Sequence, residues 1–346
     1  MSVRHVSLAV TYNGATDITK DIEADLVSFS YNDNEAGTKD DISITLRDTD
    51  QKWSGEWYPT HGDSISAAII VDGQRLQCGT FAIDEITVSG PPRTVDISAS
   101  SAPRRATGTS SKGSAPKGGA INEKRTKYFE NSTLEDIAKN VCDSCGLKLK
   151  YLPKSKPFFK WAQQRDETGY AFVKRIAWSR GFGVKTTPST LIILEHKSVD
   201  SGEYMPSPEP IDLSVNDVMT WSFASTTAQQ VQTVEVRYYD PKARKTYVEK
   251  ATDDSVTSGI VMRISGDVDS KESAQELAKA HLRTANVKSA TGSITIPGRV
   301  DLVAGVAIQI HGFAAFDGKY TAKKVGHQVS GGYVCTVELE KAIEKF

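Results

Sequence analysis

The chain has 346 residues, of which 38% are hydrophobic and 25% charged, and its formal net charge is −1. This length is enough for two or three domains with their own cores. No apolar run approaches the roughly 20 residues of a membrane span and no signal-peptide core is visible, so we expect no membrane insertion. Four cysteines do not make a disulfide framework, which favours synthesis in a reducing cytoplasm.

The first hundred residues are predicted to be rich in β-strands. Residues 41–46 alternate apolar and polar side chains, and residues 64–71 and 80–86 are predicted to form further strands. Trp53 and Trp57 flank the loop between the first two of these strands. Aromatic rings in such a loop either anchor the end of a barrel, contact a partner or pack in the core, and core packing is the interpretation we prefer.

A change of composition follows this first region. Residues 104–122 consist mainly of Ser, Thr, Gly, Ala, Pro and basic residues, which leaves almost no apolar surface to bury. We therefore predict a first β-domain over residues 1–103 and a flexible linker over 104–122.

Helical patterns characterise the next segment, residues 123–205. Ser132 and Glu135 have the spacing of a capping box, apolar residues follow at helical spacing, and Gly146 is suited to end the helix. A second helix is predicted over residues 168–180. The segment is therefore predicted to be a small α/β insert.

The middle of the chain is basic. From Arg104 to Lys197 there are 19 Lys and Arg against 8 Asp and Glu, whereas the rest of the chain has 23 against 35. Such a charge favours an acidic neighbouring surface or a nucleic acid. Because no nucleic-acid-binding motif accompanies it, we prefer an insert that docks on acidic neighbours, and we expect no sequence-specific nucleic-acid partner.

Residues 206–346 are predicted to form a second β-domain with one helix. Residues 231–239 alternate over nine positions, an amphipathic helix is expected near 270–285, and residues 294–339 predict about four strands. The predicted fold class is thus α+β and β-dominated, with two β-domains around the small α/β insert.

One pattern occurs near each end of the chain. Residues 62–99 and 305–339 both show short strands separated by turn glycines, with an aromatic residue two positions after a glycine. Similarity in a fixed order indicates a duplicated β-module, although two copies with different gaps also leave chance open.

Cysteine and histidine patterns do not indicate a reactive or metal site. Cys142 and Cys145 form a Cys-x-x-Cys motif, but at the predicted C-terminal end of a helix, where the helix dipole opposes thiolate formation. No second Cys or His pair has zinc spacing. His311 and His327 fall in adjacent predicted strands and could approach each other, but satisfied strand histidines are the preferred interpretation.

Adjacent carboxylates at Asp166 and Glu167, near Trp161, are compatible with a glycosidase-type pair. Acidic residues at a helix N-terminus are instead expected from the helix dipole, which is the interpretation we prefer. We therefore predict no catalytic residues, no cofactor and no metal, and a protein that is not an enzyme.

Three stretches, taken together, carry a resemblance to a known family. They are residues 41–98, with the Trp53 and Trp57 loop; residues 132–170; and residues 297–339, from Pro-Gly-Arg-Val-Asp through Phe-Asp-Gly-Lys-Tyr. In this order and spacing the chain resembles the late-control D protein family of contractile-tailed phages, which is related to the N-terminal part of type VI secretion spike proteins. Gly169 departs from the family pattern, which more often has Asp there, and this affects only a helix cap.

The resemblance implies a structural baseplate hub of a contractile phage tail or phage-tail-like particle. It implies a homotrimer with two tube-type β-barrels per subunit, which joins a six-fold tail tube to a three-fold spike. The implied partners are the tail tube protein, the central spike protein and other baseplate proteins, and the implied location is the virion or particle, after synthesis in the bacterial cytoplasm. Because no β-helix repeats precede Phe346, the spike is expected to be a separate polypeptide.

Three aromatic residues are predicted at inter-subunit or partner contacts, namely Trp53, Trp57 and Phe316, since exposed aromatic side chains concentrate interface energy. Two other classes of function stay open. A tail-associated peptidoglycan-cleaving enzyme would use Glu167 as its acid, and a nucleic-acid-binding module would use the basic middle segment.

Overall fold

The structure is a computed structural model that describes residues 4–101, 121, 123–187, 189–195, 210–226, 230–240, 244–254, 256–265, 268, 270–286 and 290–341. Apart from Ile121, the predicted linker over residues 104–122 lies outside the described residues.

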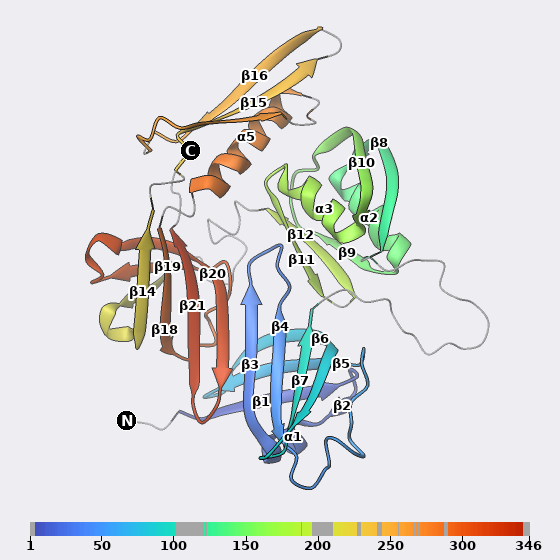
Figure 1. The fold of residues 1–346 in the computed structure, drawn as a ribbon, viewed down its shortest axis with the longest axis vertical. Helices are drawn as coiled ribbons and strands as arrows, with labels where there is room; N and C mark the ends of the chain where they lie inside the picture. The colour runs from blue at the N-terminus through green and yellow to red at the C-terminus, as the bar shows by residue number, and fades with distance from the viewer. Residues whose placement is uncertain are drawn as a thin grey trace, which may run out of the picture.

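A sheet of 13 strands runs through the molecule (Figure 1). Its strands from the first part of the chain are β1 (Val6–Tyr12), β2 (Thr16–Asp17), β3 (Leu26–Asn34), β4 (Asp41–Arg47), β5 (Ser64–Val71), β6 (Gln74–Ser89) and β7 (Thr94–Ser100). Those from the last part are β13 (Ile211–Ser214), β14 (Thr220–Ser225), β18 (Ala290–Pro297), β19 (Ala307–His311), β20 (Gly318–Val329) and β21 (Tyr333–Lys341). The order is β14-β18-β21-β20-β3-β4-β7-β6-β5-β1-β2, with β19 paired to β20 and β13 paired to β19.

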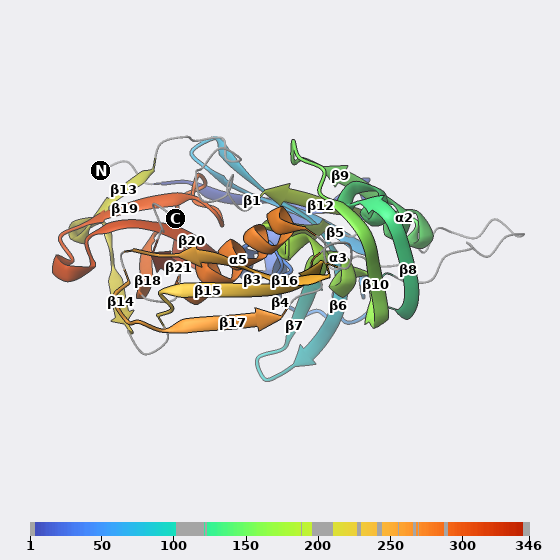
Figure 2. The same cartoon turned by 90° about the horizontal axis from the view of Figure 1, so that it is seen from above.

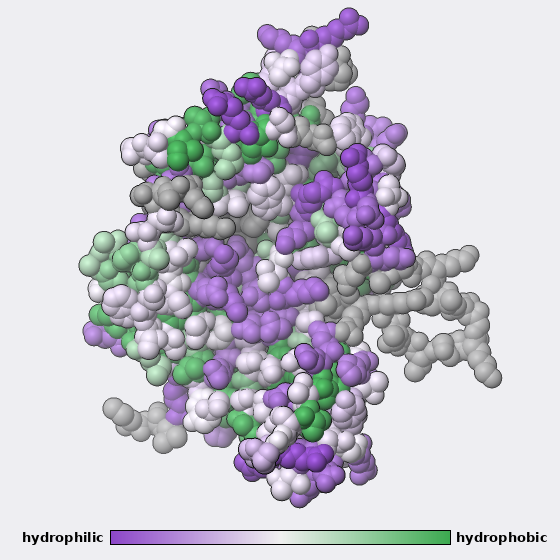
Figure 3. All heavy atoms as spheres, viewed as in Figure 1, coloured by the Kyte–Doolittle hydropathy of each residue, from purple (hydrophilic) through white to green (hydrophobic). Residues whose placement is uncertain are grey.

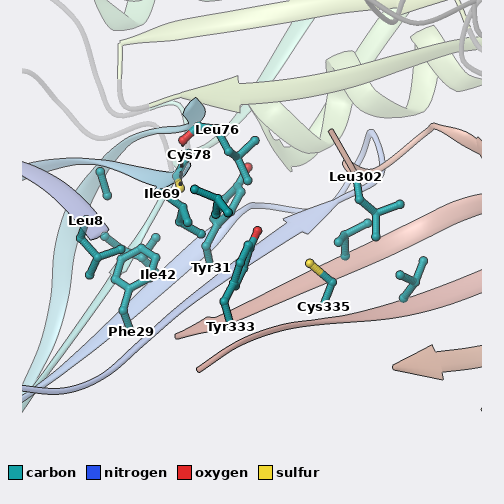
Figure 4. Packing of buried hydrophobic residues seen from close by; sticks show 14 of the residues in the cluster. Leu8, Phe29, Tyr31, Ile42, Ile69, Leu76, Cys78, Leu302, Tyr333 and Cys335 are labelled. Carbon is teal, nitrogen blue, oxygen red and sulfur yellow. Dashed lines mark hydrogen bonds between the residues drawn. The ribbon is translucent and has the colours of Figure 1, made fainter. Parts of the chain in front are cut away.

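The apolar face of this sheet forms one continuous core (Figure 4). In β4 the predicted alternation is observed, because Ile42, Ile44 and Leu46 are at most 1% exposed and the residues between them are half-buried. The short helix α1 (Thr19–Asp25) adds Ile22 to the same core. Because both ends of the chain line this core, burial of either half depends on the other.

Residues 121–195 form a separate α/β insert with its own core. It contains the two-stranded sheet of β8 (Lys124–Thr133) and β10 (Phe158–Thr168), the three-stranded sheet of β9 (Lys148–Tyr151), β11 (Phe182–Thr187) and β12 (Thr190–Glu195), and the helices α2 (Leu134–Cys145) and α3 (Gly169–Trp178). Both predicted helices are confirmed.

The cap of α2 differs by one residue from the prediction. Thr133, rather than Ser132, caps the helix: its Oγ1 accepts a hydrogen bond from Asp136 N at 3.2 Å, and Asp136 Oδ2 accepts one from Thr133 N at 3.1 Å. Ser132 Oγ instead donates to the carbonyl of Glu130 at 2.8 Å, so it is not available to cap the helix. The helix ends, as predicted, at Gly146, which has the left-handed φ of 71°.

Residues 230–286 form a second small unit, which we call the helix–sheet unit. Its strands β15 (Thr233–Asp240), β16 (Lys245–Thr252) and β17 (Val261–Ser265) make a separate three-stranded sheet, which packs on α5 (Lys271–Asn286). The prediction included these strands in the second β-domain without assigning them to a sheet of their own, and the structure adds that detail. The alternating residues of β15 correctly indicate a strand with one buried face. This face packs against Leu277, Leu282 and other residues of α5, not against the large sheet.

The two small units lie side by side beyond one end of the large sheet, as Figures 1 and 2 show. They touch through Trp178 of α3 and His281 of α5, whose rings are 4.7 Å apart, and through an ion pair of 3.6 Å between Arg180 and Glu276. Hydrophilic residues gather over the α/β insert (Figure 3), in agreement with its basic composition. Within the described ranges, no helix combines the length and the apolar composition that crossing a membrane requires.

Candidate functional site: the module junction and the sheet edges

The two β-rich parts of the chain meet where β3 pairs with the second half of β20. This antiparallel pairing runs from Lys324 opposite Asn34 to Val329 opposite Phe29. We call β1–β7 the first module and β13, β14 and β18–β21 the second module, and this contact the module junction. The sequence analysis did not predict that the two modules share one sheet.

The side chains at the module junction are buried and aromatic. His327 on β20 stacks on Tyr31 of β3 at a centroid distance of 5.6 Å, and its Nδ1 lies 2.7 Å from the hydroxyl of Tyr333 and 3.3 Å from the sulfur of Cys335. Figure 4 shows Tyr31 and Tyr333 between residues of the two modules. Burial lowers the pKa of His327 to about 4, although the charge of Asp33 opposes this shift.

Asp33 joins three parts of the molecule at the same place. Its Oδ1 pairs with Lys185 of the α/β insert at 2.9 Å, and its Oδ2 accepts a hydrogen bond from Ala304 N of the second module at 2.8 Å. Asp40 lies 3.7 Å from the same ammonium, and burial raises the pKa of this carboxyl to about 6. The junction therefore buries both stacked rings and polar groups that are paired with one another.

The two sequence copies form equivalent strand patterns. In the first module the long strand β6 pairs with β5 through its first half and with β7 through its second half. In the second module the long strand β20 pairs with β19 through its first half and with β21 along its length. Each long strand has a β-bulge near its middle, directly after Ile83 in β6 and directly after Ala322 in β20.

Backbone hydrogen bonds fix the same point in both copies. The carbonyl of Ile83 accepts from Gly62 N at 3.0 Å, and the carbonyl of Ala322 accepts from Gly305 N at 2.7 Å. Gly62 and Gly305 have positive φ values of 93° and 90°, which glycine adopts without strain. The repeat found in the sequence is therefore a repeat of strand pairing.

The two modules differ in which strand edges have a neighbour. The second half of β20 pairs with β3, whereas the second half of β6, from Glu85 to Ser89, has only β7 beside it among the described strands. On the opposite side of the sheet, β14 has only β18 beside it among the described strands. These two segments are open edges of the large sheet, as are the outer strands β2 and β13 among the described residues.

Aromatic side chains hold the open edge strand β14 against the second module. Phe223 of β14 stacks on Phe316 at 5.3 Å and packs edge-on against Phe313 at 5.2 Å. Trp221 of β14 contacts Phe313 at 5.6 Å but keeps 53% of its surface exposed. Phe316, which the sequence analysis predicted at an interface, is half-buried and supports β14 from behind.

The two predicted interface tryptophans have different environments. Trp53 is only 3% exposed and its indole N–H donates to Asp25 at 2.8 Å, so the expectation that it offers exposed aromatic surface is wrong. Trp57 is 39% exposed, packs edge-on against Trp53 at 5.7 Å, and lies beneath the ammonium of Lys52. The loop buries its first tryptophan because Asp25 satisfies the indole N–H there.

The motifs considered for catalysis are not arranged for it. Cys142 lies at the C-terminal end of α2, as predicted, and burial raises the pKa of its thiol to about 12. Asp166 and Glu167 lie at the end of β10, directly before the cap residue Thr168, and so adjoin the N-terminus of α3 as predicted. Glu167 is held by Arg175, whose guanidinium donates to its two carboxylate oxygens at 2.5 and 3.3 Å.

Metal ligation has no support in the described part of the chain, where no group of three or more His, Cys, Asp and Glu side chains is placed to hold an ion. His311 and His327 do not meet: His311 is at the exposed end of β19, 3.3 Å from Asp212, and His327 is in the junction core. A cleft of about 580 Å³ lies between the α/β insert and the helix–sheet unit, with Trp161 and Arg165 on one wall and Leu277 on the other.

Comparison with known proteins identifies the family. The family model described as "Phage tail baseplate hub (GPD)" matches residues 116–333, which include the α/β insert, the helix–sheet unit and most of the second module. The chain belongs to this phage tail baseplate hub family. The resemblance to the late-control D proteins stated from the sequence is thereby confirmed.

Two curated relatives carry the same designation. The chain is 24% identical over 238 residues to the "Probable baseplate hub protein" of Escherichia phage 186, which covers 68% of the chain and 57% of the relative. It is 27% identical over 181 residues to the protein of that name from Escherichia phage P2, which covers 52% of the chain and 43% of the relative. The baseplate hub chain thus spans about half the length of the curated relatives it matches.

Solved structures share the fold of this hub-family chain over nearly its whole length. The 43 kDa tail protein of prophage MuSo2 from Shewanella oneidensis has a TM-score of 0.67 at 15% identity, covering 98% of the chain and 99% of that protein. A tail protein from Neisseria meningitidis MC58 has a TM-score of 0.68 at 14% identity, with 97% of each chain covered. The predicted β-dominated α+β fold class is confirmed.

A type VI secretion protein has the same fold with a lower score. The c3393 protein of E. coli, described as a component of the type VI secretion system, has a TM-score of 0.56 at 13% identity and covers 92% of the chain and 74% of its own length. At this identity the likeness establishes the fold only.

Proposed function

We propose that this hub-family chain is a structural, non-enzymatic subunit of the baseplate of a contractile phage tail or phage-tail-like particle. Three copies form a ring that joins a six-fold tail tube to a three-fold spike. The observation that carries the proposal is the repeated strand pairing of the two modules in one continuous sheet. A trimer of subunits with two equivalent modules each contains six modules, so one ring matches both a six-fold tube and a three-fold spike.

In this proposal each part of the chain has its own task. Residues 1–103 and 206–346 provide the two tube-like β-barrel domains, with the helix–sheet unit as an addition to the second, and residues 104–122 connect the first domain to the insert over 123–205. The tail tube protein docks on one face of the ring and the central spike protein on the other. The α/β insert, with its excess of basic side chains, faces acidic surfaces of other baseplate proteins.

The mass of the purified protein in solution tests this function. Light scattering on the full chain, alone and then mixed with the spike protein of the same particle, is expected to give about three times the subunit mass of 37.6 kDa in at least one state. A monomer that also ignores the spike protein contradicts the hub ring.

The two other classes of function have direct tests. A peptidoglycan-cleaving enzyme needs a free acid, but Glu167 is ion-paired to Arg175, so a zymogram on cell-wall material is expected to show no clearing. A nucleic-acid-binding module needs affinity that falls steeply with salt, so the absence of a gel shift at low salt removes it.

A further inference from the structure

The internal repeat predicts what lies beside the open edges of β6 and β14. Within the chain, the second half of β20 pairs with β3. The counterpart of β20 in the first module is β6, and the counterpart of β3 in the second module is β14. These two counterparts are the strands that lack this neighbour among the described residues.

We propose that the second half of β6 pairs, antiparallel, with β14 of a second copy of this chain. The contact between modules within one chain is then repeated between chains. This inference rests on the proposed ring and names its subunit interface.

The alignment of the two modules follows from their bulges and cross-strand partners. Directly after the bulge, Glu85 of β6 faces β7 as Lys324 of β20 faces β21, which aligns these two residues. In the first module β7 pairs with β4 and β4 pairs with β3. In the second module β21 pairs with β18 and β18 pairs with β14, and the residues face one another in the same register. This path aligns Phe29 of β3 with Trp221 of β14.

The alignment converts the observed junction into a predicted register. Gly326 faces Asn32 at the junction, and its counterpart is Thr87 facing Ala224 of the next copy. By the same rule, His327 facing Tyr31 corresponds to Val88 facing Phe223. The remaining predicted pairs are Ile86 with Ser225 and Ser89 with Ser222.

The surface of both segments suits a strand partner. All six residues of β14 are uncharged, and five of them are exposed, including the apolar Trp221 and Ala224. Val88 on β6 is 44% exposed and Met219, next to β14, is 61% exposed. A sheet edge in a soluble monomer is normally protected by charges, prolines or a covering segment, and β14 has no charge and no proline.

The two edges lie on opposite sides of the molecule, with β14 at the left of Figure 1 and β6 at the right. Each copy therefore uses one edge for each neighbour, which is a heterologous contact that closes into a ring when the rotation fits. A closed ring of three copies then contains six modules.

A disulfide between the predicted partners tests the register. We would combine Thr87→Cys with Ala224→Cys in the full chain, on a background with Cys145→Ser, because Cys145 is the native cysteine that is only half-buried. Directly opposite residues of paired strands are close enough for a disulfide. The matched control combines Thr87→Cys with Ser222→Cys, whose residues are two positions out of register and therefore too far apart.

The expected result is disulfide-linked dimers and trimers on a non-reducing gel for the first pair, reversed by reductant, and at least ten-fold less cross-linked product for the control. Equal cross-linking of both pairs overturns the register. A trimer by light scattering without cross-linking of the first pair overturns the strand contact and leaves the hub ring standing. A monomer without any cross-link, even with the spike protein, overturns both.

Discussion

The carboxylate of Asp33 and the ammonium of Lys185 form an ion pair of 2.9 Å between residues 152 positions apart in the chain. The side chain of Asp33 is 7% exposed and that of Lys185 is 25% exposed. The second oxygen of the carboxylate bonds to Ala304 N, so one side chain connects the first module, the α/β insert and the second module.

Replacing Asp33 by Asn is expected to lower the free energy of unfolding by about 2–3 kcal/mol. The amide cannot form an ion pair with Lys185, whose ammonium is left with the longer contact of 3.7 Å to Asp40. Part of this cost is relieved because Lys185 also reaches solvent. Urea denaturation at pH 7 measures the change. Asp143→Asn is the matched control, since Asp143 pairs with Lys139 at the exposed surface of α2 and its loss is expected to cost little.

A double variant separates the ion pair from other effects. Lys185→Met alone leaves the Asp33 charge buried, and Asp33→Asn together with Lys185→Met removes both charges. We expect the double variant to be more stable than the sum of the two single losses implies. Strictly additive losses would contradict a direct interaction.

His327 is expected to make stability fall in acid. In the unfolded chain the histidine pKa is near 6.5, and in the folded chain burial lowers it to about 4. The unfolded state therefore binds the extra proton between these values, and the free energy of unfolding decreases as the pH falls from about 6.5 to about 4, by at most about 3 kcal/mol.

His327→Phe tests this contribution, because it keeps a flat ring against Tyr31 but binds no proton. Urea denaturation at pH 7 and pH 4.5 is expected to show that the free energy of unfolding falls less between these two pH values in this variant than in the wild type. Asp40, whose raised pKa of about 6 acts in the opposite direction, is present in both proteins and cancels in the comparison.

The two loop tryptophans are expected to respond differently to truncation. Trp53→Ala removes a buried ring and the hydrogen bond to Asp25, which is expected to lower the free energy of unfolding by about 3–5 kcal/mol. Trp57→Ala removes a ring that is 39% exposed and is expected to cost about 1 kcal/mol or less. If Trp57 contacts a partner, this second variant weakens the trimer in light scattering while its melting curve is nearly unchanged.

A methyl group at Gly292 is expected to dislodge the open edge strand. A Cβ there would lie 2.4 Å from the ring of Phe223, so the ring has to leave its stack on Phe316. Gly292→Ala is expected to destabilise the fold by about 1–3 kcal/mol and to weaken trimer formation more strongly than stability alone explains. Gly332→Ala is the control, since a Cβ there meets nothing within 4 Å, and equal effects of the two variants would exclude the packing argument.

The local elements of this fold were predictable because their signals are local. Alternation in residues 41–46 and the helical spacing after Thr133 act within a few residues, and both elements are present. The separate sheet of the helix–sheet unit was not predicted, because alternation shows that a face is buried but not what covers it. The covering helix, α5, follows its sheet by only a few residues, and this closeness was the available signal.

The module junction and the open edges depend on pairing between residues about 300 positions apart, which no sequence window contains. The repeat at residues 62–99 and 305–339 showed that two modules exist but not that one sheet includes both. The ring of Phe316 lies behind β14 in the same chain, and its contact with a partner stays a prediction. For Trp53 the same signal was misleading, because Asp25, which binds its indole, follows no recognisable motif.

The pairing of β3 with β20 also sets an order of events during synthesis. β3 leaves the ribosome early and has β4 as its only neighbour until residues 324–329 emerge. A nascent chain therefore exposes an apolar strand edge for most of its translation, which favours association with chaperones. Because the second half of the core closes last, a product truncated before β18 lacks both a finished sheet and the strand that holds β14 in place.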